Sequence, residues 1–336
     1  MIEAAFSAPL ETLFEQFDRK PLAAASIGQV YRAQFDSRSV AVKVQYPQIR
    51  ETMAGDFSRL SGIARVASLA TAVDGAALVE ELRARIDEEC DYVREAAHQT
   101  AFRRAFASDA QILIPEIVWA RTRPQVLTTE FCRGDDFYSF VQTAEPPTRN
   151  AMALVLARFA FTSLFGLAAI NADPHPGNYL FTDDRRVVFL DFGCVCRFDF
   201  DFLGAHKKLI SIVVADQKSA FRDALLDTGM VAKPKGFDFD LHWQLLCHEY
   251  APYRSANFRF DKSWLQRGLE FSKPGNPNLR RLAISPQWIW LERLIWGLHA
   301  VLTRLNAEAD FAAVMREALA CELRPLAVAM PAPTFP

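Results

Sequence analysis

The sequence predicts an α+β fold with two lobes, in which a small lobe of strands and helices precedes a larger, mostly helical lobe. The chain of 336 residues is long enough for two lobes, and a hydrophobic content of 51% supplies a packed core. Alternating apolar and polar residues between positions 29 and 45 predict a hairpin, whereas the pattern after position 194 is mainly helical. Between 171 and 193, acids, an amide and a glycine are spaced around two short predicted strands.

These patterns divide the chain into four segments. Residues 1–20 are predicted to form a helix, and residues 21–131 a small lobe with a helical insertion from Pro47 to about Ala107. Residues 132–325 are the predicted helical lobe, and residues 326–336 a Pro-rich, frayed tail. The first helix is predicted from one apolar stripe, which consists of Phe6, Leu10, Leu13, Phe14 and Phe17.

Composition argues against several functions. The net charge is −2, and Lys and Arg are evenly scattered, so the sequence predicts no basic surface that would bind nucleic acid. The six cysteines form no C-x-x-C pair and no signal peptide follows Met1, which predicts a reducing cytoplasm. The most apolar stretch, 151–170, contains Arg158 near its middle, and an arginine at the centre of a membrane span costs about 2.5–3.5 kcal/mol. We therefore expect a buried core helix there.

A loop of small residues opens the small lobe and leads into the hairpin. Ala24, Ala25, Ser26 and Gly28 belong to this loop, which is small enough to approach a ligand. After a turn at 36–37, a second strand contains the sequence Val-Ala-Val-Lys. On this strand Lys43 points to one face, and its neighbours Val42 and Val44 point to the other. The pattern matches the V-A-I-K strand, whose lysine contacts the α- and β-phosphates of a nucleotide.

Acidic residues follow an apolar helix face between 78 and 95. A helix beside the Lys43 strand is expected to pair that ammonium with a carboxylate, as kinase-type sites do. Helix spacing places Asp91 and Glu95 on one face and favours Glu95 as the partner, while Glu89 stays open as the alternative.

Two further strands are predicted over 117–120 and 125–131, with prolines at their boundaries. The second strand leads into a loop that ends at Gly134. In a two-lobed nucleotide enzyme this exit is the hinge, whose backbone groups read the edge of the adenine. We therefore expect Glu130 and Cys132 to contact the nucleotide.

Asp173 and Asn178 have the D-x-x-x-x-N spacing of a phosphotransferase catalytic loop, and Asp191-Phe192-Gly193 matches the D-F-G turn. Short strands at 179–181 and 186–190 would hold the two acids together as a hairpin. Asp173 is then the base or the group that orients the acceptor, while Asn178 and Asp191 are Mg²⁺ ligands through oxygen. The alternative is that these residues only cap a helix and turns, but their chain order after Lys43 argues against it.

Four motifs together resemble the UbiB/AarF/ADCK family of atypical protein-kinase-like proteins. They are P-L-A-A-A-S-I-G-Q-V-Y-x-A at 21–33, V-A-V-K-V-Q-Y-P at 40–47, E-x-D-Y-x-x-E-A at 89–96 and N-A-D-P-H-P-G-N at 171–178. The resemblance implies a kinase-like fold that binds ATP with Mg²⁺ and supports the biosynthesis or handling of ubiquinone and related isoprenoid lipids. It also implies isoprenoid or quinone-precursor lipids, or proteins of lipid biosynthesis, as partners, with peripheral membrane contact.

Three features depart from protein kinases or from the family. Alanines at 23–25 replace glycines, and a positive φ would cost each of them about 1 kcal/mol or more, so the loop should be stiffer. No A-P-E sequence follows Gly193, which argues against a protein substrate. The family's K-x-G-Q extension is absent from the sequence, so we expect Glu89 and Asp91 to lack their lysine partner.

The function predicted first is an ATP- and Mg²⁺-dependent ATPase or phosphotransferase that serves ubiquinone and isoprenoid lipid metabolism, in the cytoplasm or peripherally at the inner membrane. One alternative is a small-molecule phosphotransferase of the aminoglycoside or choline kinase type, against which the Ala-rich loop argues. The other is a nucleotide-binding pseudokinase that acts as a lipid-binding scaffold, which the missing K-x-G-Q segment makes plausible.

Overall fold

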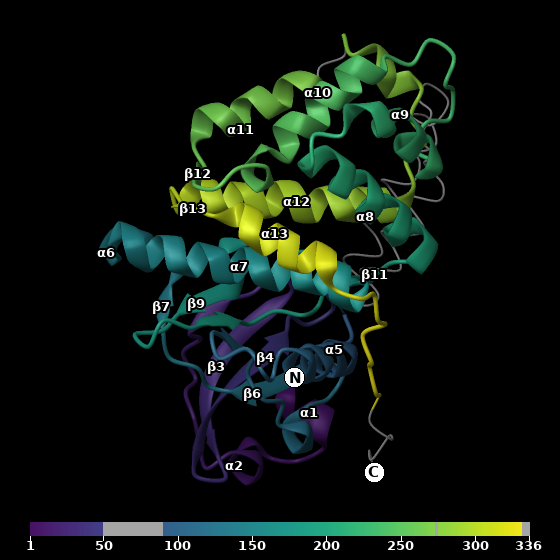
Figure 1. Ribbon diagram of the computed structural model, residues 1–336. Helices are drawn as coiled ribbons and strands as arrows, with labels where there is room; N and C mark the ends of the chain where they lie inside the picture. The colour runs from purple at the N-terminus through teal and green to yellow at the C-terminus, as the bar shows by residue number, and fades with distance from the viewer. Residues whose placement is uncertain (50–89, 273–274, 331–336) are drawn as a thin grey trace.

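The small lobe is built on an antiparallel hairpin of two strands, β3 (Gly28–Phe35) and β4 (Arg38–Gln45) (Figure 1). The structure is a computed structural model, and it describes residues 1–49, 90–272 and 275–330. The turn residues Asp36 and Ser37 have φ of 52° and 57°, the left-handed conformation that matches the twist of a two-residue hairpin. β6 (Val126–Glu130) pairs with the free edge of β4, and β1 (Gln16–Phe17) and β2 (Ala23–Ala24) pair with β3. The predicted hairpin and the predicted strand at 125–131 are thereby confirmed.

Helix α5 (Tyr92–Ala105) lies against this sheet and begins at Asp91, whose carboxylate accepts a hydrogen bond of 3.0 Å from the amide of Val93. Its first turns are buried against the sheet, where Tyr92 and Ala96 share an apolar cluster with Ile27, Ile117 and Leu127. This packing fixes the rotation of α5 and directs Glu95 toward β4.

The prediction of one helix over residues 1–20 is wrong. The segment forms two short helices, α1 (Ile2–Phe6) and α2 (Leu10–Leu13), and then β1. Ser7 ends α1 in the left-handed conformation with φ of 51°, and Pro9 cannot continue a helix because it lacks an amide N–H. The predicted apolar residues still gather in one cluster on the sheet, although they come from three elements: Phe6, Leu10, Leu13, Phe14 and Phe17.

The predicted strand at 117–120 is also largely absent. Ile117 makes one isolated bridge to Thr129, after which residues Trp119–Arg121 form a 3₁₀ turn, η1. The amide of Val118 donates to the carbonyl of Thr128 at 2.8 Å, and the hydroxyl of Thr128 donates to the carbonyl of Arg121, so the pairing with β6 ends where the 3₁₀ turn begins. An unpredicted strand, β5 (Ile112–Leu113), instead pairs in parallel with β10 (Val187–Phe189) of the large lobe.

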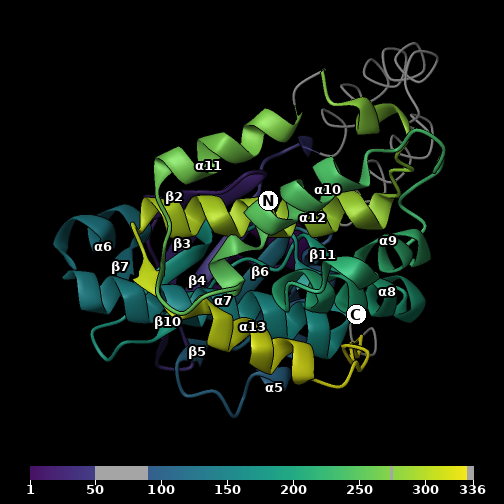
Figure 2. The ribbon, with the colours of Figure 1, turned by 45° about the horizontal axis from the view of Figure 1, so that its top comes forward.

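The large lobe is organised around α7 (Pro146–Leu167), against which α12 (Pro286–Arg304) and α13 (Phe311–Ala320) pack (Figures 1 and 2). Within the described residues, α7 is the helix that is long and apolar enough to cross a membrane, but 67% of its most apolar window is buried. The side chain of Arg158 is only partly buried, and its Nε forms an ion pair with Oδ2 of Asp109 at 2.8 Å. The placement agrees with the predicted core helix.

Short strands connect the helical core to the junction of the lobes. A four-stranded sheet has the order β5-β10-β9-β7, in which β9 (Tyr179–Phe181) and β10 are the predicted antiparallel hairpin and β7 is Asp135–Asp136. A second ladder pairs β8 (Ala169–Asn171) with β11 (Val195–Arg197). The loop after β8 and the turn between β10 and β11 therefore lie side by side.

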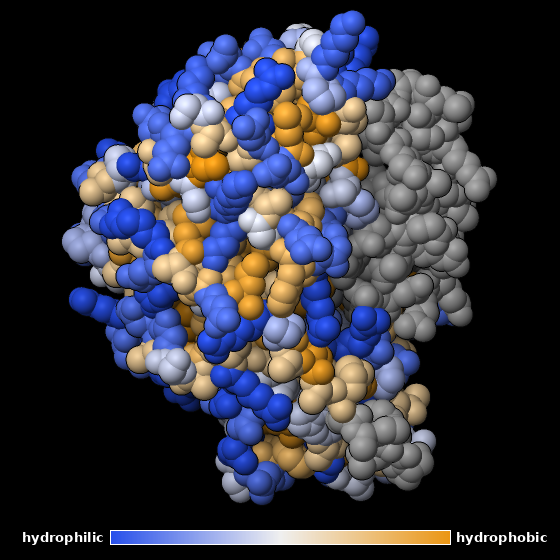
Figure 3. All heavy atoms as spheres, turned by 45° about the vertical axis from the view of Figure 1, so that its right-hand side comes forward, coloured by the Kyte–Doolittle hydropathy of each residue, from blue (hydrophilic) through white to orange (hydrophobic). Residues whose placement is uncertain are grey.

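The other helices and short strands of the large lobe are α6 (Phe137–Thr143), α8 (Phe200–Val214), α9 (Lys218–Asp227), α10 (Phe239–Glu249), β12 (Phe258–Arg259), α11 (Lys262–Leu269) and β13 (Glu308–Ala309). Of these, α6 lies beside β7 and β9 at the junction of the lobes, whereas α9, α10 and α11 lie at the end of the large lobe that is far from the small lobe (Figure 1). On the face in Figure 3, apolar side chains are scattered among hydrophilic ones. After α13, residues 321–330 form neither helix nor strand. They run beside α5, where Val328 lies near Arg94.

Candidate nucleotide site

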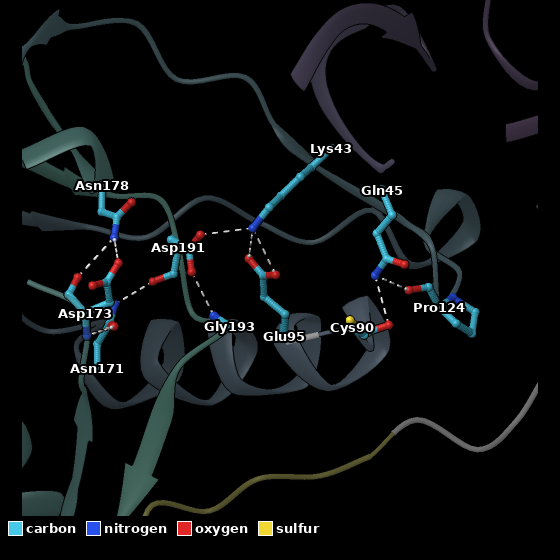
Figure 4. Close-up of polar contacts among 10 residues, drawn as sticks. All are labelled: Lys43, Gln45, Cys90, Glu95, Pro124, Asn171, Asp173, Asn178, Asp191 and Gly193. Carbon is cyan, nitrogen blue, oxygen red and sulfur yellow. Dashed lines mark hydrogen bonds and ion pairs between the residues drawn. The ribbon is translucent and has the colours of Figure 1, made fainter. Parts of the chain in front are cut away.

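Lys43 is the centre of the polar contacts between the lobes (Figure 4). Its Nζ lies 3.0 Å and 3.1 Å from the two carboxylate oxygens of Glu95 on α5. The same Nζ lies 3.0 Å from Oδ2 of Asp191, which follows β10 in the large lobe. The structure thus brings together three residues that the sequence places 52 and 148 positions apart.

The charges of these three groups depend on one another. Burial alone would lower the pKa of Lys43, but Asp191 and Glu95 outweigh it and hold that pKa well above its ordinary value. Burial raises the pKa of Glu95 to about 7, against the attraction of Lys43. Burial would also raise the pKa of Asp191, yet Lys43 and the amide of Gly193 lower it. Asp191 is therefore the carboxylate that is firmly charged at neutral pH.

The D-F-G turn is held in place by its own hydrogen bonds. Oδ1 of Asp191 accepts a bond of 2.9 Å from the amide of Gly193, and Asn171 donates its side-chain amide to the carbonyl of Asp191. Phe192 is fully buried and packs against Phe102 of α5, with ring centroids 5.1 Å apart. Packing of the turn against α5 couples the position of Asp191 to that of Glu95.

The loop predicted to be catalytic presents Asp173 beside Asn178 (Figure 4). The amide of Asn178 donates to the carbonyl of Asp173 at 3.0 Å and to its Oδ2 at 3.2 Å. His175 closes the loop, because its Nδ1 accepts a bond of 3.0 Å from the amide of Gly177. Asp173 also receives a side chain that sequence reasoning missed, since Nη2 of Arg293 on α12 lies 3.0 Å from Oδ1.

The Ala-rich loop covers one side of the site. Ser26 and Ile27 line a small pocket together with Lys43, Glu95, Asp173, Asp191, Gly193 and Cys194. Ala24 pairs with Gln29 across β2 and β3, and the amide of Ala25 donates to the carbonyl of Gly28 at 2.8 Å, which closes a tight turn. In the described residues, no alanine of this loop has a positive φ, as the sequence predicts.

Gly28 has a structural reason to be glycine that is separate from nucleotide binding. A Cβ at this position would lie 2.2 Å from the carbonyl oxygen of Val44 on the neighbouring strand. The close approach of β3 and β4 therefore excludes a side chain, and Gly28 does not line the small pocket. The sequence alone could not separate this role from a phosphate contact.

The predicted hinge residues are Glu130, the last residue of β6, and Cys132 just after that strand, and both lie outside the small pocket. The side chain of Glu130 is exposed, and its amide donates to the carbonyl of Glu116 at 2.8 Å, so this donor is occupied. Within the described part of the chain, the backbone of Cys132 has no hydrogen-bond partner. Burial raises the pKa of the Cys132 thiol to about 12, which keeps it neutral. The backbone N–H and C=O of Cys132 are thus free to bond a nucleotide, whereas the N–H of Glu130 is already bonded.

The residues predicted to hold Mg²⁺ have suitable chemistry. Asn178 directs its amide nitrogen to Asp173, and its carbonyl oxygen points away from that residue (Figure 4). Asp191 supplies a charged carboxylate. Mg²⁺ prefers oxygen ligands and is commonly held by one or two protein groups together with substrate phosphates. Among the described residues, no cluster of three or more His, Cys, Asp or Glu side chains is placed to hold a metal ion without a bound substrate.

The alternative partner predicted for Lys43, Glu89, lies outside the described residues, as does most of the predicted helical insertion. Among the described residues, the Lys43 ammonium contacts Glu95 and Asp191 and lies 5.0 Å from the ring centroid of Tyr92. Asp91 caps α5 instead of facing Lys43.

Two features define a protein-kinase-like fold. The small lobe has a strand lysine that pairs with a helix glutamate, and the helical lobe carries the D-x-x-x-x-N loop and the D-F-G turn. The solved Rv3197–erythromycin complex from Mycobacterium tuberculosis shares this fold with a TM-score of 0.79 and 24% identity, covering 94% of this chain and 81% of that chain. The chain belongs to the family of the ABC1 atypical kinase-like domain, whose model matches residues 1–224. The resemblance noted in the sequence is thereby confirmed.

Two relatives show what this family includes. The Protein ACTIVITY OF BC1 COMPLEX KINASE 3, chloroplastic, of Arabidopsis thaliana is 35% identical over 199 residues, which are 57% of this chain and 28% of that protein. The Atypical kinase COQ8, mitochondrial, of Schizosaccharomyces pombe is 31% identical over 205 residues, which are 59% of this chain and 33% of that protein. The matched part therefore spans about a third or less of these relatives.

Proposed function

We propose that the chain binds ATP with Mg²⁺ between its lobes and acts as an ATPase or phosphotransferase. The observation that carries this proposal is the contact of Lys43 with both Glu95 and Asp191, at 3.0 Å each. Phosphoryl transfer in kinase-like proteins needs such a lysine and glutamate pair and a metal-binding aspartate in place at the same time. Membership of an atypical kinase-like family supports the same conclusion.

Each residue has a distinct part in this proposal. Lys43 contacts the phosphates and is kept charged by its two carboxylates. Free backbone groups at Cys132 receive the adenine edge, and the loop at Ser26 covers the phosphates. Asp191 and Asn178 hold Mg²⁺, which neutralises charge on the phosphates when bound. Asp173 orients the acceptor or accepts its proton.

We further propose a role in ubiquinone or related isoprenoid lipid metabolism, with a lipid or a protein of lipid biosynthesis as the partner. The motif resemblance to the UbiB/AarF/ADCK family supports this role, as does the relative named COQ8. We propose that contact with a membrane is peripheral; among the described residues, the apolar helix α7 is mostly buried in the core, which supports this. In this function the acceptor of the phosphoryl group is water, a lipid-linked group or a soluble molecule.

The experiment is to measure ATP turnover of the purified chain with Mg²⁺, alone, with liposomes and with a phenolic quinone precursor. Stimulation by liposomes or by the phenol supports the lipid role. Stimulation by soluble amino alcohols or aminoglycosides alone would favour a small-molecule phosphotransferase. Intact nucleotide binding with no turnover in any condition would favour the pseudokinase scaffold and exclude both enzyme functions. The Asp191→Asn variant provides the background rate.

A further inference from the structure

Helix α12 contacts the catalytic loop at two positions one turn apart. Arg293 donates from Nε to the carbonyl of Ala172 at 2.9 Å and from Nη2 to Oδ1 of Asp173 at 3.0 Å. At Gly297, a Cβ would lie 2.4 Å from Cγ of Pro174, so the helix backbone presses directly on the loop. These contacts come from a part of the chain beyond residue 224, where the match to the family model ends.

The two oxygens of the Asp173 carboxylate are held by different elements. Oδ2 accepts from Asn178 within the loop, at 3.2 Å, and Oδ1 accepts from Arg293 on α12. Two donors fix the plane of a carboxylate, whereas one donor leaves it free to rotate. The side chain of Asp173 remains 41% exposed, so an acceptor can still reach it.

Arg293 is itself held by a rigid support. Leu294, Ile295 and Leu298 of α12 are at most 3% exposed and belong to the main core of the large lobe. The guanidinium carbon lies 5.6 Å from the ring centroid of Trp290. A side chain placed by a packed helix positions its partner more accurately than one placed by a loop.

The energy of the ion pair does not account for this arrangement. Arg293 and Asp173 are 50% and 41% exposed, and exposed ion pairs contribute about 0–1 kcal/mol to stability. In contrast, misplacing a reacting group by about 1 Å lowers a rate by about 10²-fold. The larger consequence of the contact is therefore kinetic.

We propose that Arg293 is a positioning residue that holds the Asp173 carboxylate toward the acceptor. The inference rests on the proposed function, because it assigns Asp173 the acceptor side of phosphoryl transfer. Arg293 acts through Asp173 and leaves nucleotide binding by Lys43 and Asp191 unchanged.

The test compares Arg293→Ala and Arg293→Lys with a matched variant, Arg304→Ala, on the same helix. Arg304 is exposed and its nearest polar partner is the hydroxyl of Tyr138, at 3.3 Å. We expect Arg293→Ala to lower kcat by about 10²-fold. Its KM for ATP and its ATP-induced melting shift should stay within twofold of wild type. The lysine should restore part of kcat, and Arg304→Ala should match wild type. An unchanged kcat in Arg293→Ala, or a loss of kcat and of ATP binding together, would overturn the inference.

A second readout does not depend on turnover. Hydrogen exchange of peptides covering 171–178 should quicken in Arg293→Ala and stay unchanged in Arg304→Ala, with both variants melting near the wild-type temperature. Unchanged exchange in this loop contradicts the positioning role. If wild type hydrolyses no ATP, the proposed function fails, and the exchange result still decides whether Arg293 holds the loop.

Discussion

The Nζ of Lys43 in strand β4 lies 3.0 Å from Oδ2 of Asp191, and this contact joins the two lobes directly. The lysine also pairs with Glu95, whose side chain is 1% exposed. A nucleotide phosphate that enters the site therefore meets a lysine that already has two partners.

Asp191→Asn should remove most of the nucleotide binding that requires Mg²⁺, because an amide is a weaker ligand and carries no charge. For the wild type, ATP at about 100 times its Kd adds about 2.7 kcal/mol to the free energy of unfolding. The variant should lose most of the corresponding melting shift in a thermal scan with ATP and Mg²⁺. Asp227→Asn on α9, whose carboxylate pairs with Lys208 at the surface, is the matched control. A full shift in Asp191→Asn would contradict the assignment.

Lys43→Met should lower turnover by about 10²-fold or more, since a preorganised cation facing the phosphates is lost. It should also lower the free energy of unfolding by about 3 kcal/mol, because Glu95 is left buried without its partner. The double variant Lys43→Met with Glu95→Gln should regain much of that stability and none of the turnover. Denaturant unfolding and ATP hydrolysis measure the two effects separately. Turnover in the double variant at the wild-type rate would show that Lys43 has no catalytic part.

Glu95 should give the chain a specific dependence of stability on pH. Its folded pKa is raised to about 7, above an unfolded value of about 4.3, so the folded state binds this proton more tightly. The stabilisation from Glu95 is complete below the unfolded pKa and is lost as the pH rises through the folded pKa. The melting temperature of wild type minus that of Glu95→Gln should therefore fall between pH 5 and pH 8. A difference that rises over this range would refute the sign.

Gly28→Ala should destabilise the small lobe without any nucleotide present. The added Cβ meets the carbonyl oxygen of Val44 at 2.2 Å, and such overpacking costs about 1–3 kcal/mol. Gly204 in α8 is the matched control, because no atom lies within 4 Å of its added Cβ. Gly204→Ala should stabilise by about 0.5–1 kcal/mol, as an alanine in a helix does. Equal stability of Gly28→Ala and wild type in the absence of ATP would show that the glycine serves the nucleotide alone.

The sequence predicted the elements whose signal is local. Alternation over 29–45 was sufficient for the hairpin and for the orientation of Lys43. Helix spacing placed Asp91 and Glu95 on one face, but it could not show which face of the helix meets β4. The N-terminal helix was wrong because an apolar stripe does not show that three short elements bury it together. The backbone conformation at Ser7 and the proline at position 9 decided that outcome.

Contacts between distant segments could not be predicted in this way. Arg293 lies 120 positions after Asp173, and the sequence signal was only a charged residue that interrupts an apolar helix. Two-residue strands such as β5 carry no periodicity at all, and the partner of β5 is β10, which comes much later in the chain. Gly28 was predicted as part of the right loop, but its clash partner on β4 is visible only in three dimensions.

The parallel pairing of β5 with β10 has a mechanical consequence. The chain leaves α5, is anchored at Ile112–Leu113 in the sheet of the large lobe, returns to β6 in the small lobe and then crosses again near Cys132. In the described residues, the chain therefore enters the large lobe both before and after β6. The ion pair between Lys43 and Asp191 adds a side-chain link between the same two lobes, so β4 and the turn after β10 are tied by charge as well as by the path of the backbone.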